Sequence, residues 1–306
     1  MSYYLGIDGG GTKTTCAVGD DSRLLTTATA GASNIVRVGE TQARESLRKS
    51  VMQACVAAGI VPSDVSRVCV GGSGAAHPEL AAVVRSMVGE TVSCPVDVVG
   101  DMEVALEAAF DTGPGVIVIA GTGSIAYGRD DRGKTARAGG FGFAIGDEGS
   151  AHWIGRTAVN SVLRASDSSD DAGESSLAKA LFKLWGVTSL MDLARAANSI
   201  PPPDFAALSP AVFASEDVIA GEVLRRAGRE LANIAAVVIE RLFPRESVDA
   251  VPVAMTGGVF RHAAMVREAF YNELCALESR AQVITQVVDP VEGALRLARR
   301  AGGMGK

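Results

Sequence analysis

Short apolar runs alternate with amphipathic stretches along the chain, and glycine-rich turns follow several of the apolar runs. Short apolar runs bounded by turns are typical of buried strands, whereas apolar positions at helical spacing predict helices. The predicted strands of the first part are residues 3–7, 14–18, 65–70 and 96–99. The predicted helices there are residues 41–58, 80–88 and 102–110. Strands that alternate with helices indicate an α/β protein.

A second cycle begins after Gly113-Pro114-Gly115. Its predicted strands are residues 116–120, 125–127, 251–255 and 283–287, and its predicted helices are 218–242, 263–277 and a last helix at about 290–301. The order strand, glycine turn, strand occurs at residues 3–18 and again at 116–127, which suggests two related halves. The length of 306 residues also fits two domains at roughly 150 residues each.

The overall composition is that of an ordinary globular protein, with 47% hydrophobic and 21% charged residues. A net charge of -6 argues against a nucleic-acid partner. The five cysteines form no CxxC pair, which argues against a disulfide framework, a zinc site or an iron–sulfur site and favours a reducing compartment. The N-terminus does not resemble a signal peptide, and no apolar run is long enough to span a bilayer. We therefore expect a cytoplasmic protein with no membrane partner.

Glycine is the one compositional excess, at 35 of 306 residues against a usual share of about 7%. Much of it lies in turns that directly follow predicted strands, at Gly9-Gly10-Gly11, Gly121-Thr122-Gly123 and Gly257-Gly258. Glycine allows backbone N–H groups to come close to anionic oxygens. Any one of these turns alone is better explained as an ordinary hairpin or strand-to-helix turn. The three together, with Asp8 and Lys13 beside the first, favour phosphate binding.

Two familiar phosphate motifs fit these turns poorly. The spacing from Gly6 to Gly11 resembles a Walker A loop, but Thr12 separates Gly11 from Lys13, and a strand rather than a helix follows. The run Gly121-x-Gly123-x-x-Ala126 matches a loose dinucleotide fingerprint, but the residues after it are predicted to be extended. A P-loop is therefore excluded, and a Rossmann dehydrogenase is a weak alternative.

Carboxylates stand at two further places of interest. Asp101 lies where strand 96–99 gives way to helix 102–110, a position at which α/β enzymes present functional side chains and at which Asp is also a good helix N-cap. The glycine-rich segment 139–150 carries the adjacent carboxylates Asp147 and Glu148, which predicts a binding loop. The three histidines are far apart in sequence and are assigned no role: His77, His152 and His262.

Taken together, these motifs resemble one known family. The segments that carry the resemblance are Leu5 to Thr14 (LGIDGGGTKT), Asp101, Gly121 to Ser124 (GTGS), Gly146 to Ile154 (GDEGSAHWI) and Thr256 to Gly258 (TGG). The chain resembles the N-acetylglucosamine kinase branch of the BadF/BadG/BcrA/BcrD ATPase family, within the actin, Hsp70 and sugar kinase superfamily. The resemblance runs from residue 3 to about Ala294, and GDEGSAHWI is its most specific part.

The resemblance implies an α/β fold of two ribonuclease-H-like (actin-like ATPase) domains, with a nucleotide and sugar cleft between them. We expect these domains at residues 1–112 and 113–306, with the last helix packing back on the N-terminal domain. ATP and Mg²⁺ are implied as the nucleotide and metal. The residues implied for the nucleotide are Gly9, Gly10, Gly11, Thr12 and Lys13 in the first phosphate loop, Gly121 and Thr122 in the second, and Gly257 and Gly258 at the adenosine. Asp8 is implied to hold the metal through water.

For the sugar, the resemblance implies contacts from Ser33, Asn34, Gly123, Ser124, Gly140, Asp147 and Glu148. It implies that Asp101 is the catalytic base, which orients the sugar hydroxyl and takes its proton as it attacks the γ-phosphoryl group. The expected reaction is conversion of N-acetylglucosamine to its 6-phosphate, with ATP and the amino sugar as the small-molecule partners. The sequence leaves open whether the protein forms a homodimer.

Two departures from the family pattern keep the exact hexose open. Gly100-Asp101-Met102-Glu103 replaces the usual Asp-Ala sequence, and Phe141 stands where relatives often carry Trp. Glucosamine or another hexose is therefore an alternative acceptor. A nucleotide-driven regulatory ATPase or a dehydratase activator without a sugar acceptor is an alternative of another class. The activator reading needs paired cysteines in a glycine-rich segment, and this sequence has none.

Overall fold

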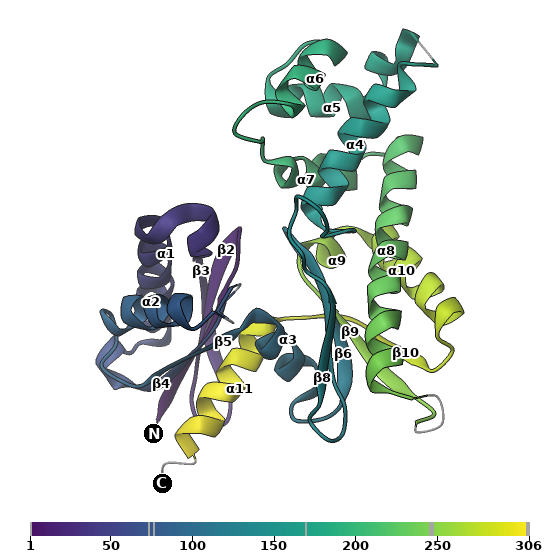
Figure 1. The fold of residues 1–306 in the computed structure, drawn as a ribbon. Helices are drawn as coiled ribbons and strands as arrows, with labels where there is room; N and C mark the ends of the chain where they lie inside the picture. Colours follow the sequence, from purple (N-terminus) through teal and green to yellow (C-terminus); the bar gives the residue numbers. More distant parts are fainter. Residues whose placement is uncertain (1, 73, 76, 169, 245–247, 304–306) are drawn as a thin grey trace. The chain divides into compact units, whose positions relative to one another are not determined.

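The chain folds into two compact units, each built on one five-stranded sheet (Figure 1). Unit 1 comprises Met1–Gly113 and Val288–Lys306, and unit 2 comprises Pro114–Val287. The computed structural model describes residues 2–303 except 73, 76, 169 and 245–247. Residues 288–303 follow unit 2 in the sequence but are part of unit 1, so the chain passes between the units twice.

The sheet of unit 1 has the strand order β3-β2-β1-β4-β5. Its strands are β1 (Tyr3–Gly9), β2 (Lys13–Gly19), β3 (Leu24–Gly31), β4 (Val65–Gly72) and β5 (Val96–Gly100). β1, β4 and β5 are parallel, whereas β2 runs antiparallel to both β1 and β3. Gly9 lies opposite Gly72, and Gly72 lies opposite Gly100. The last residues of the three parallel strands thus form one row at the carboxyl edge of the sheet.

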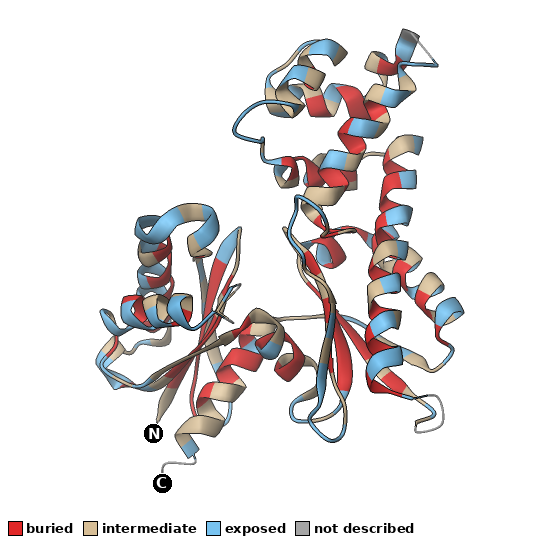
Figure 2. Ribbon diagram, in the orientation of Figure 1, coloured by how far each residue is buried: buried red, intermediate tan, exposed pale blue. Residues whose placement is uncertain are grey.

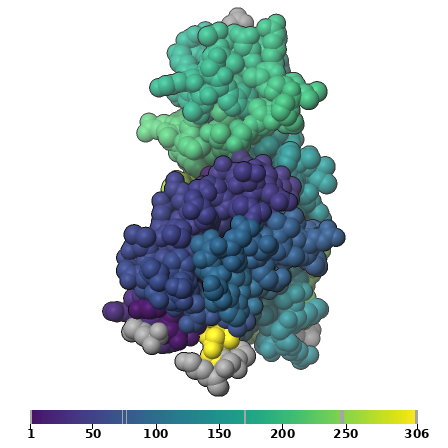
Figure 3. All heavy atoms as spheres, turned by 90° about the vertical axis from the view of Figure 1, so that its left-hand side faces the viewer, coloured from purple at the N-terminus to yellow at the C-terminus, as the bar shows by residue number. Residues whose placement is uncertain are grey.

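Helices cover both faces of this sheet (Figures 1 and 2). The helices are α1 (Ile35–Ala58), α2 (Pro78–Gly89), α3 (Asp101–Phe110) and α11 (Pro290–Gly303), with a 3₁₀ turn at Pro62–Asp64. Because side chains alternate along a strand, Leu5 and Ile7 pack with α1 and α2 on one face, while Tyr4 packs with α11 on the other. Figure 3 shows the outer surface of α1 and α2. α11 approaches β1 so closely that a Cβ at Gly6 would lie 2.3 Å from the backbone nitrogen of Leu295.

The sheet of unit 2 repeats this arrangement, with the order β8-β7-β6-β9-β10. Its strands are β6 (Gly115–Ala120), β7 (Ser124–Arg129), β8 (Thr135–Gly139), β9 (Val251–Thr256) and β10 (Ala281–Val288). As in unit 1, the first strand pairs antiparallel with the second and parallel with the fourth. The repeated order of strand, glycine turn and strand in the sequence therefore reflects two units of the same topology.

The helices of unit 2 form one large apolar core with its sheet. They are α4 (Ala151–Ala165), α5 (Ser176–Trp185), α6 (Leu190–Ala197), α7 (Ser209–Phe213), α8 (Val218–Leu242), α9 (Gly258–His262) and α10 (Ala264–Leu277), with 3₁₀ turns at Asp170–Glu174 and Phe205–Leu208. α8 packs against β6, β7 and β8 and against α10. α4 to α7 form a helical insertion between β8 and α8, drawn at the top of Figure 1.

Two strands were missing from the sequence-based prediction. β3 and β8 are the outer strands of their sheets, and most of their residues are half-buried or exposed. Their sequences, LLTTATAG and TARAG, therefore lack the apolar run that marks a buried strand. Among the described residues, no helix combines the length and apolarity that crossing a bilayer requires.

Candidate active site

The first glycine turn joins β1 to β2 at the carboxyl edge of the unit 1 sheet. Asp8 and Gly9 are the last residues of β1, and Lys13 is the first of β2. The backbone N–H of Gly10 donates to the carbonyl of Lys13 at 3.0 Å, which closes the turn. Gly11 is half-buried, and Thr12 and Lys13 are exposed. The turn therefore presents backbone and a cationic side chain to solvent, as a phosphate site requires.

The segment of Ser33 and Asn34 is held against this turn. Both backbone N–H groups donate to the carbonyl of Gly10, at 3.1 and 3.3 Å. A Cβ at Gly9 would lie 2.8 Å from the Ser33 Oγ, so glycine is required for this close approach. Asn34 is also the N-cap of α1, because its Oδ1 accepts the backbone N–H of Arg37 at 3.3 Å. The Asn34 side chain therefore fixes the start of α1 beside the first glycine turn.

Asp101 is the first residue of α3 and directly follows β5. The sequence alone left open whether it is a helix cap. The structure assigns that position to Gly100, whose backbone N–H donates to the carboxylate of Glu103 at 3.2 Å. One Asp101 oxygen accepts the N–H of Met102 at 3.0 Å. Because Gly100 lies in the same row as Gly72 and Gly9, the half-buried Asp101 side chain belongs to the same sheet edge as the first glycine turn.

The second glycine turn joins β6 to β7 in unit 2, and the start of α4 packs against it. The N–H of Gly121 donates to the carbonyl of Gly123 at 2.9 Å. The N–H groups of Ala151 and His152 donate back to the carbonyls of Gly121 and Thr122, at 2.8 and 3.4 Å. The GDEGS segment and the second turn therefore form one hydrogen-bonded structure.

Two side-chain contacts strengthen this connection. Ser124 Oγ donates to the carbonyl of Glu148 at 2.7 Å. The buried Asp147 carboxylate accepts backbone N–H groups of Ser124 and Gly142, which lower its pKa, but burial is the larger effect and raises the pKa above its ordinary value. A Cβ at Gly123 would lie 2.8 Å from Asp147 Oδ2. Asp147 thus fills the space beside the second turn, whereas Glu148 is half-buried.

The third glycine turn lies beside the second. β9 pairs in parallel with β6, with Thr256 opposite Ile119. Gly257 has φ 105° and ψ 167°, and a Cβ there would lie 2.3 Å from the carbonyl oxygen of Ala120, the residue before Gly121. Gly258 then starts α9. Gly140, the residue after β8, also has a left-handed backbone, and a Cβ there would lie 2.6 Å from Ile125 Cδ1.

The imidazole ring of His152 lies between two aromatic side chains. Its centroid is 5.0 Å from that of Phe143 and 5.3 Å from that of Phe205. Phe205 in turn packs edge-on against Trp185. These contacts join the loop after β8, through Phe143, to the helical insertion, through Phe205.

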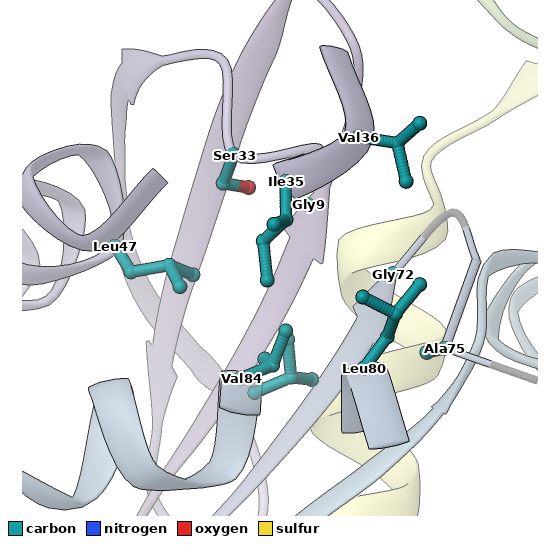
Figure 4. Close-up of a pocket in the computed structure, with 10 residues that line it drawn as sticks. Gly9, Ser33, Ile35, Val36, Leu47, Gly72, Ala75, Leu80 and Val84 are labelled. Atoms are coloured by element: carbon teal, nitrogen blue, oxygen red, sulfur yellow. The ribbon is translucent and has the colours of Figure 1, made fainter. Parts of the chain in front are cut away.

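A pocket opens beside the first glycine turn in unit 1 (Figure 4). It contains about 380 Å³ of empty space, its mouth included. Its lining residues come from β1, β4, α1, α2 and the segments next to them: Gly9, Ser33, Ile35, Val36, Leu47, Val70, Gly72, Ala75, Leu80 and Val84. The lining is aliphatic apart from the Ser33 hydroxyl and backbone atoms.

The carboxylates suit a metal held mainly by phosphate. The described residues contain no group of three or more His, Cys, Asp or Glu side chains that could hold a metal ion by themselves. Mg²⁺ is commonly bound through one or two carboxylates together with substrate phosphates and water. The half-buried Asp8, directly before the first glycine turn, fits that donor set.

The structure thus gathers the expected residues into one group in each unit. Unit 1 brings together the first turn, Ser33, Asn34 and Asp101, and unit 2 brings together the other two turns and the GDEGS segment. Two residues in the unit 1 group were absent from the site predicted from the sequence. Gly72 lies between Gly9 and Gly100, and the buried Thr14 contacts Ser33 at 2.8 Å. The Gly71-Gly72 pair after an apolar strand was a usable signal for the first, whereas the second depends on the pairing of β2 with β3.

Paired sheets of this topology, with a glycine turn after the first strand of each, define an actin-like ATPase fold. The chain belongs to the BadF/BadG/BcrA/BcrD ATPase family, whose model matches residues 5–298.

Individual relatives match the chain over nearly their full length. The chain is 30% identical to an N-acetylmuramic acid/N-acetylglucosamine kinase of Clostridium acetobutylicum, over 98% of this chain and 99% of the relative. It is also 30% identical to an N-acetyl-D-glucosamine kinase of Dictyostelium discoideum, over 96% and 97% of the two chains. A provisionally assigned N-acetylglucosamine kinase from Chromobacterium violaceum has a solved structure with a TM-score of 0.77 and 27% identity, covering 97% of this chain and 99% of that one.

Proposed function

We propose that this protein transfers the γ-phosphoryl group of ATP to a hydroxyl of an amino sugar, with N-acetylglucosamine as the acceptor and its 6-phosphate as the product. The observation that carries the proposal is the position of Asp101. Its carboxylate stands at the same sheet edge as the first glycine turn and the Ser33–Asn34 segment, in a chain of an ATPase family. The names of the two full-length relatives support a sugar as the acceptor.

In this proposal the glycine turns bind phosphate groups of ATP. The first turn contributes backbone N–H groups and the Lys13 ammonium, and the second contributes Gly121 and Thr122. Gly257 and Gly258 contact the adenosine. Asp8 would hold Mg²⁺ through water, and the metal would neutralise charge on the phosphate oxygens. The residues proposed for the sugar are Ser33, Asn34, Gly123, Ser124, Gly140, Asp147 and Glu148.

In this scheme Asp101 is the catalytic base. It accepts a hydrogen bond from the sugar hydroxyl, orients that oxygen toward the γ-phosphorus and takes the proton as the new P–O bond forms. The bond to the β-phosphate oxygen breaks, and ADP leaves. Little covalent chemistry is needed from the protein. Positioning of the reactants and electrostatic stabilisation of the transition state by the turns therefore supply most of the rate enhancement.

An assay of ADP release over a panel of sugars tests the proposal. N-acetylglucosamine should stimulate ADP release strongly over the rate without sugar, and the phosphorylated position can be read by NMR of the product. Glucosamine, glucose and N-acetylmuramic acid complete the panel. Sugar-independent hydrolysis at the same rate would indicate a nucleotide-driven ATPase, and no turnover with any sugar would refute a kinase.

Substitution of Asp101 by Asn tests the base. The variant should lose about 10²- to 10⁴-fold in kcat because a positioned base contributes that much, while KM for ATP should change little. Asp97→Asn is the matched control, because Asp97 lies on the same strand but pairs with Arg67 at 2.7 Å. Near-normal turnover of the Asp101 variant would remove this residue from the mechanism.

A further inference from the structure

The link between β5 and α3 determines where the carboxylate of Asp101 lies. Asp101 is the first residue of α3, and Gly100, directly before it, is the last residue of β5. Gly100 has no side chain, so it cannot accept an N–H group of the first helical turn as Ser, Thr or Asp would. Glycine also restricts the backbone less than other residues do. A permissive link therefore stands directly before the residue proposed as the base.

The body of α3 is fixed by two neighbouring elements at Val104. A Cβ at Gly71 of β4 would lie 2.3 Å from Val104 Cγ2, so this side chain packs directly on the strand. A Cβ at Gly293 of α11 would lie 1.9 Å from the Val104 carbonyl oxygen, so α11 also lies against the helix (Figure 1). These contacts hold α3, but they act three residues after Asp101, where the first turn is already complete.

Glu103 joins this first turn to the strand. Its Oε1 accepts the backbone N–H of Gly100 at 3.2 Å. A Cβ at Gly100 would lie 3.3 Å from the same oxygen, so glycine leaves room for this approach. Within the turn, Asp101 Oδ1 accepts the N–H of Met102 at 3.0 Å. One oxygen of the Asp101 carboxylate is thus bound to the stretch of backbone that the Glu103 contact closes.

We propose that Glu103 is a positioning residue for the base. By binding the N–H of Gly100, it fixes the backbone on both sides of Asp101 and thereby the carboxylate that orients the sugar hydroxyl. The proposal rests on the proposed function, in which Asp101 takes the proton of that hydroxyl. It adds a residue that acts through Asp101 and has no contact with ATP, metal or sugar assigned to it.

The role requires an acceptor at the end of a side chain of this length, rather than a negative charge. Gln has the same length as Glu and keeps a carbonyl oxygen that can accept the N–H of Gly100. Ala removes the acceptor altogether. A carboxylate near a helix N-terminus also interacts favourably with the helix dipole, but Gln would not replace Glu if that interaction were the whole effect. The pair of variants therefore separates the hydrogen bond from the charge.

Kinetics of variants at position 103 test the proposal. Glu103→Ala should lower kcat for N-acetylglucosamine about 10-fold, a part of the roughly 10²-fold that a misplacement of about 1 Å can cost. KM for ATP should change little, and Glu103→Gln should restore most of kcat. Because Glu103 is exposed, these variants should fold. Glu292→Ala is the matched control, since Glu292 is also an exposed acidic residue in the first turn of a helix of unit 1. Each rate is divided by the folded fraction, measured by circular dichroism.

A double variant distinguishes positioning from general destabilisation. If Glu103 acts through Asp101, Glu103→Ala should have little further effect on the residual kcat of Asp101→Asn. If that residual rate is too low to measure, the comparison of Ala with Gln at position 103 decides. Equal losses in both backgrounds, full activity of Glu103→Ala, or an equal defect in Glu103→Gln would each overturn the role of Glu103 and leave the kinase intact. Absence of turnover by the unmodified protein with every sugar would instead refute the proposed function.

Discussion

Asp147, in the loop after β8, is constrained both by its backbone conformation and by the burial of its carboxylate. Its φ of 61° is in the left-handed region, which Asn and Asp tolerate better than other side chains. Its carboxylate accepts two backbone N–H groups, yet burial raises its pKa. The residue therefore fixes the loop beside the second glycine turn while its charged form carries a desolvation cost.

This cost predicts a pH dependence. For an acid whose pKa is raised by folding, stability is highest while the group is protonated and falls as the pH rises through the folded pKa. The free energy of unfolding should therefore decline with pH above the ordinary Asp value of 3.8, relative to Asp147→Asn. Asn keeps the left-handed backbone and one acceptor. Urea titrations of both proteins over acidic to neutral pH measure the difference, and a constant difference would contradict this account.

Gly257 gives a second prediction at this scale. Gly257→Ala places a residue with a side chain at φ 105°, and its Cβ would lie 2.3 Å from the carbonyl oxygen of Ala120. Because that oxygen belongs to the backbone, a change of side-chain rotamer cannot relieve the contact. The backbone conformation alone should cost about 1–3 kcal/mol. Gly258→Ala is the matched control for stability, because its Cβ would meet nothing within 4 Å. Urea denaturation should show a large loss for the first variant and little for the second; equal losses would contradict the prediction.

At the scale of elements, the pairing of α3 with α11 holds the helix that starts with Asp101. Arg296 donates to the carbonyls of Glu107 and Ala108, at 3.1 and 3.2 Å. Arg300 pairs with the carboxylates of Glu107 and Asp111. The two helices also approach closely, since a Cβ at Gly293 would overlap the carbonyl oxygen of Val104. The end of α3 opposite Asp101 is thus fixed by α11.

Removing Arg300 should therefore destabilise unit 1. The side chain of Glu107 is only 3% exposed, so Arg300→Met leaves its carboxylate buried without that partner. A loss of about 3 kcal/mol in the free energy of unfolding is expected, as for other broken buried pairs. Lys179→Met is the control, because the Lys179–Glu174 pair is largely exposed and should contribute little. Similar losses in both variants would show that Arg300 is not specific in this role.

The apolar pattern predicted central elements better than outer ones. α8 has the bounds that its helical spacing predicted, because its buried positions recur at nearly every turn. β3 and β8 gave no comparable signal because each is an outer strand with little buried surface. The glycine turns of the site could be placed from the sequence since each follows a buried strand. The contact of Thr14 with Ser33 could not, because it depends on how β2 and β3 pair.

At the scale of the whole molecule, the chain builds two sheets with the same strand order, and the C-terminal helix α11 packs against the first of them. The amphipathic pattern of α11 predicts that one face is buried, but not which sheet it covers. In the structure, Val291, Ala294, Leu295 and Ala298 of α11 pack against Tyr4, Ala17, Cys69 and Val104 of unit 1. Unit 1 is therefore formed by two parts of the chain that are separated by all of unit 2.

A chain that ends at Val287 should consequently lose order in one unit only. Without α11, an apolar face of the unit 1 sheet is exposed to water, and the core that includes Tyr4 and Cys69 is incomplete. Unit 2 keeps its own core, because none of that core's residues comes from α11. Hydrogen exchange followed by mass spectrometry should show loss of amide protection in β1, β4 and α3, with peptides from β6, β9 and α8 as the internal reference. Protection retained in β1 and β4, or lost equally in both units, would contradict this division, because the first outcome would make α11 dispensable and the second would make the two cores one cooperative structure.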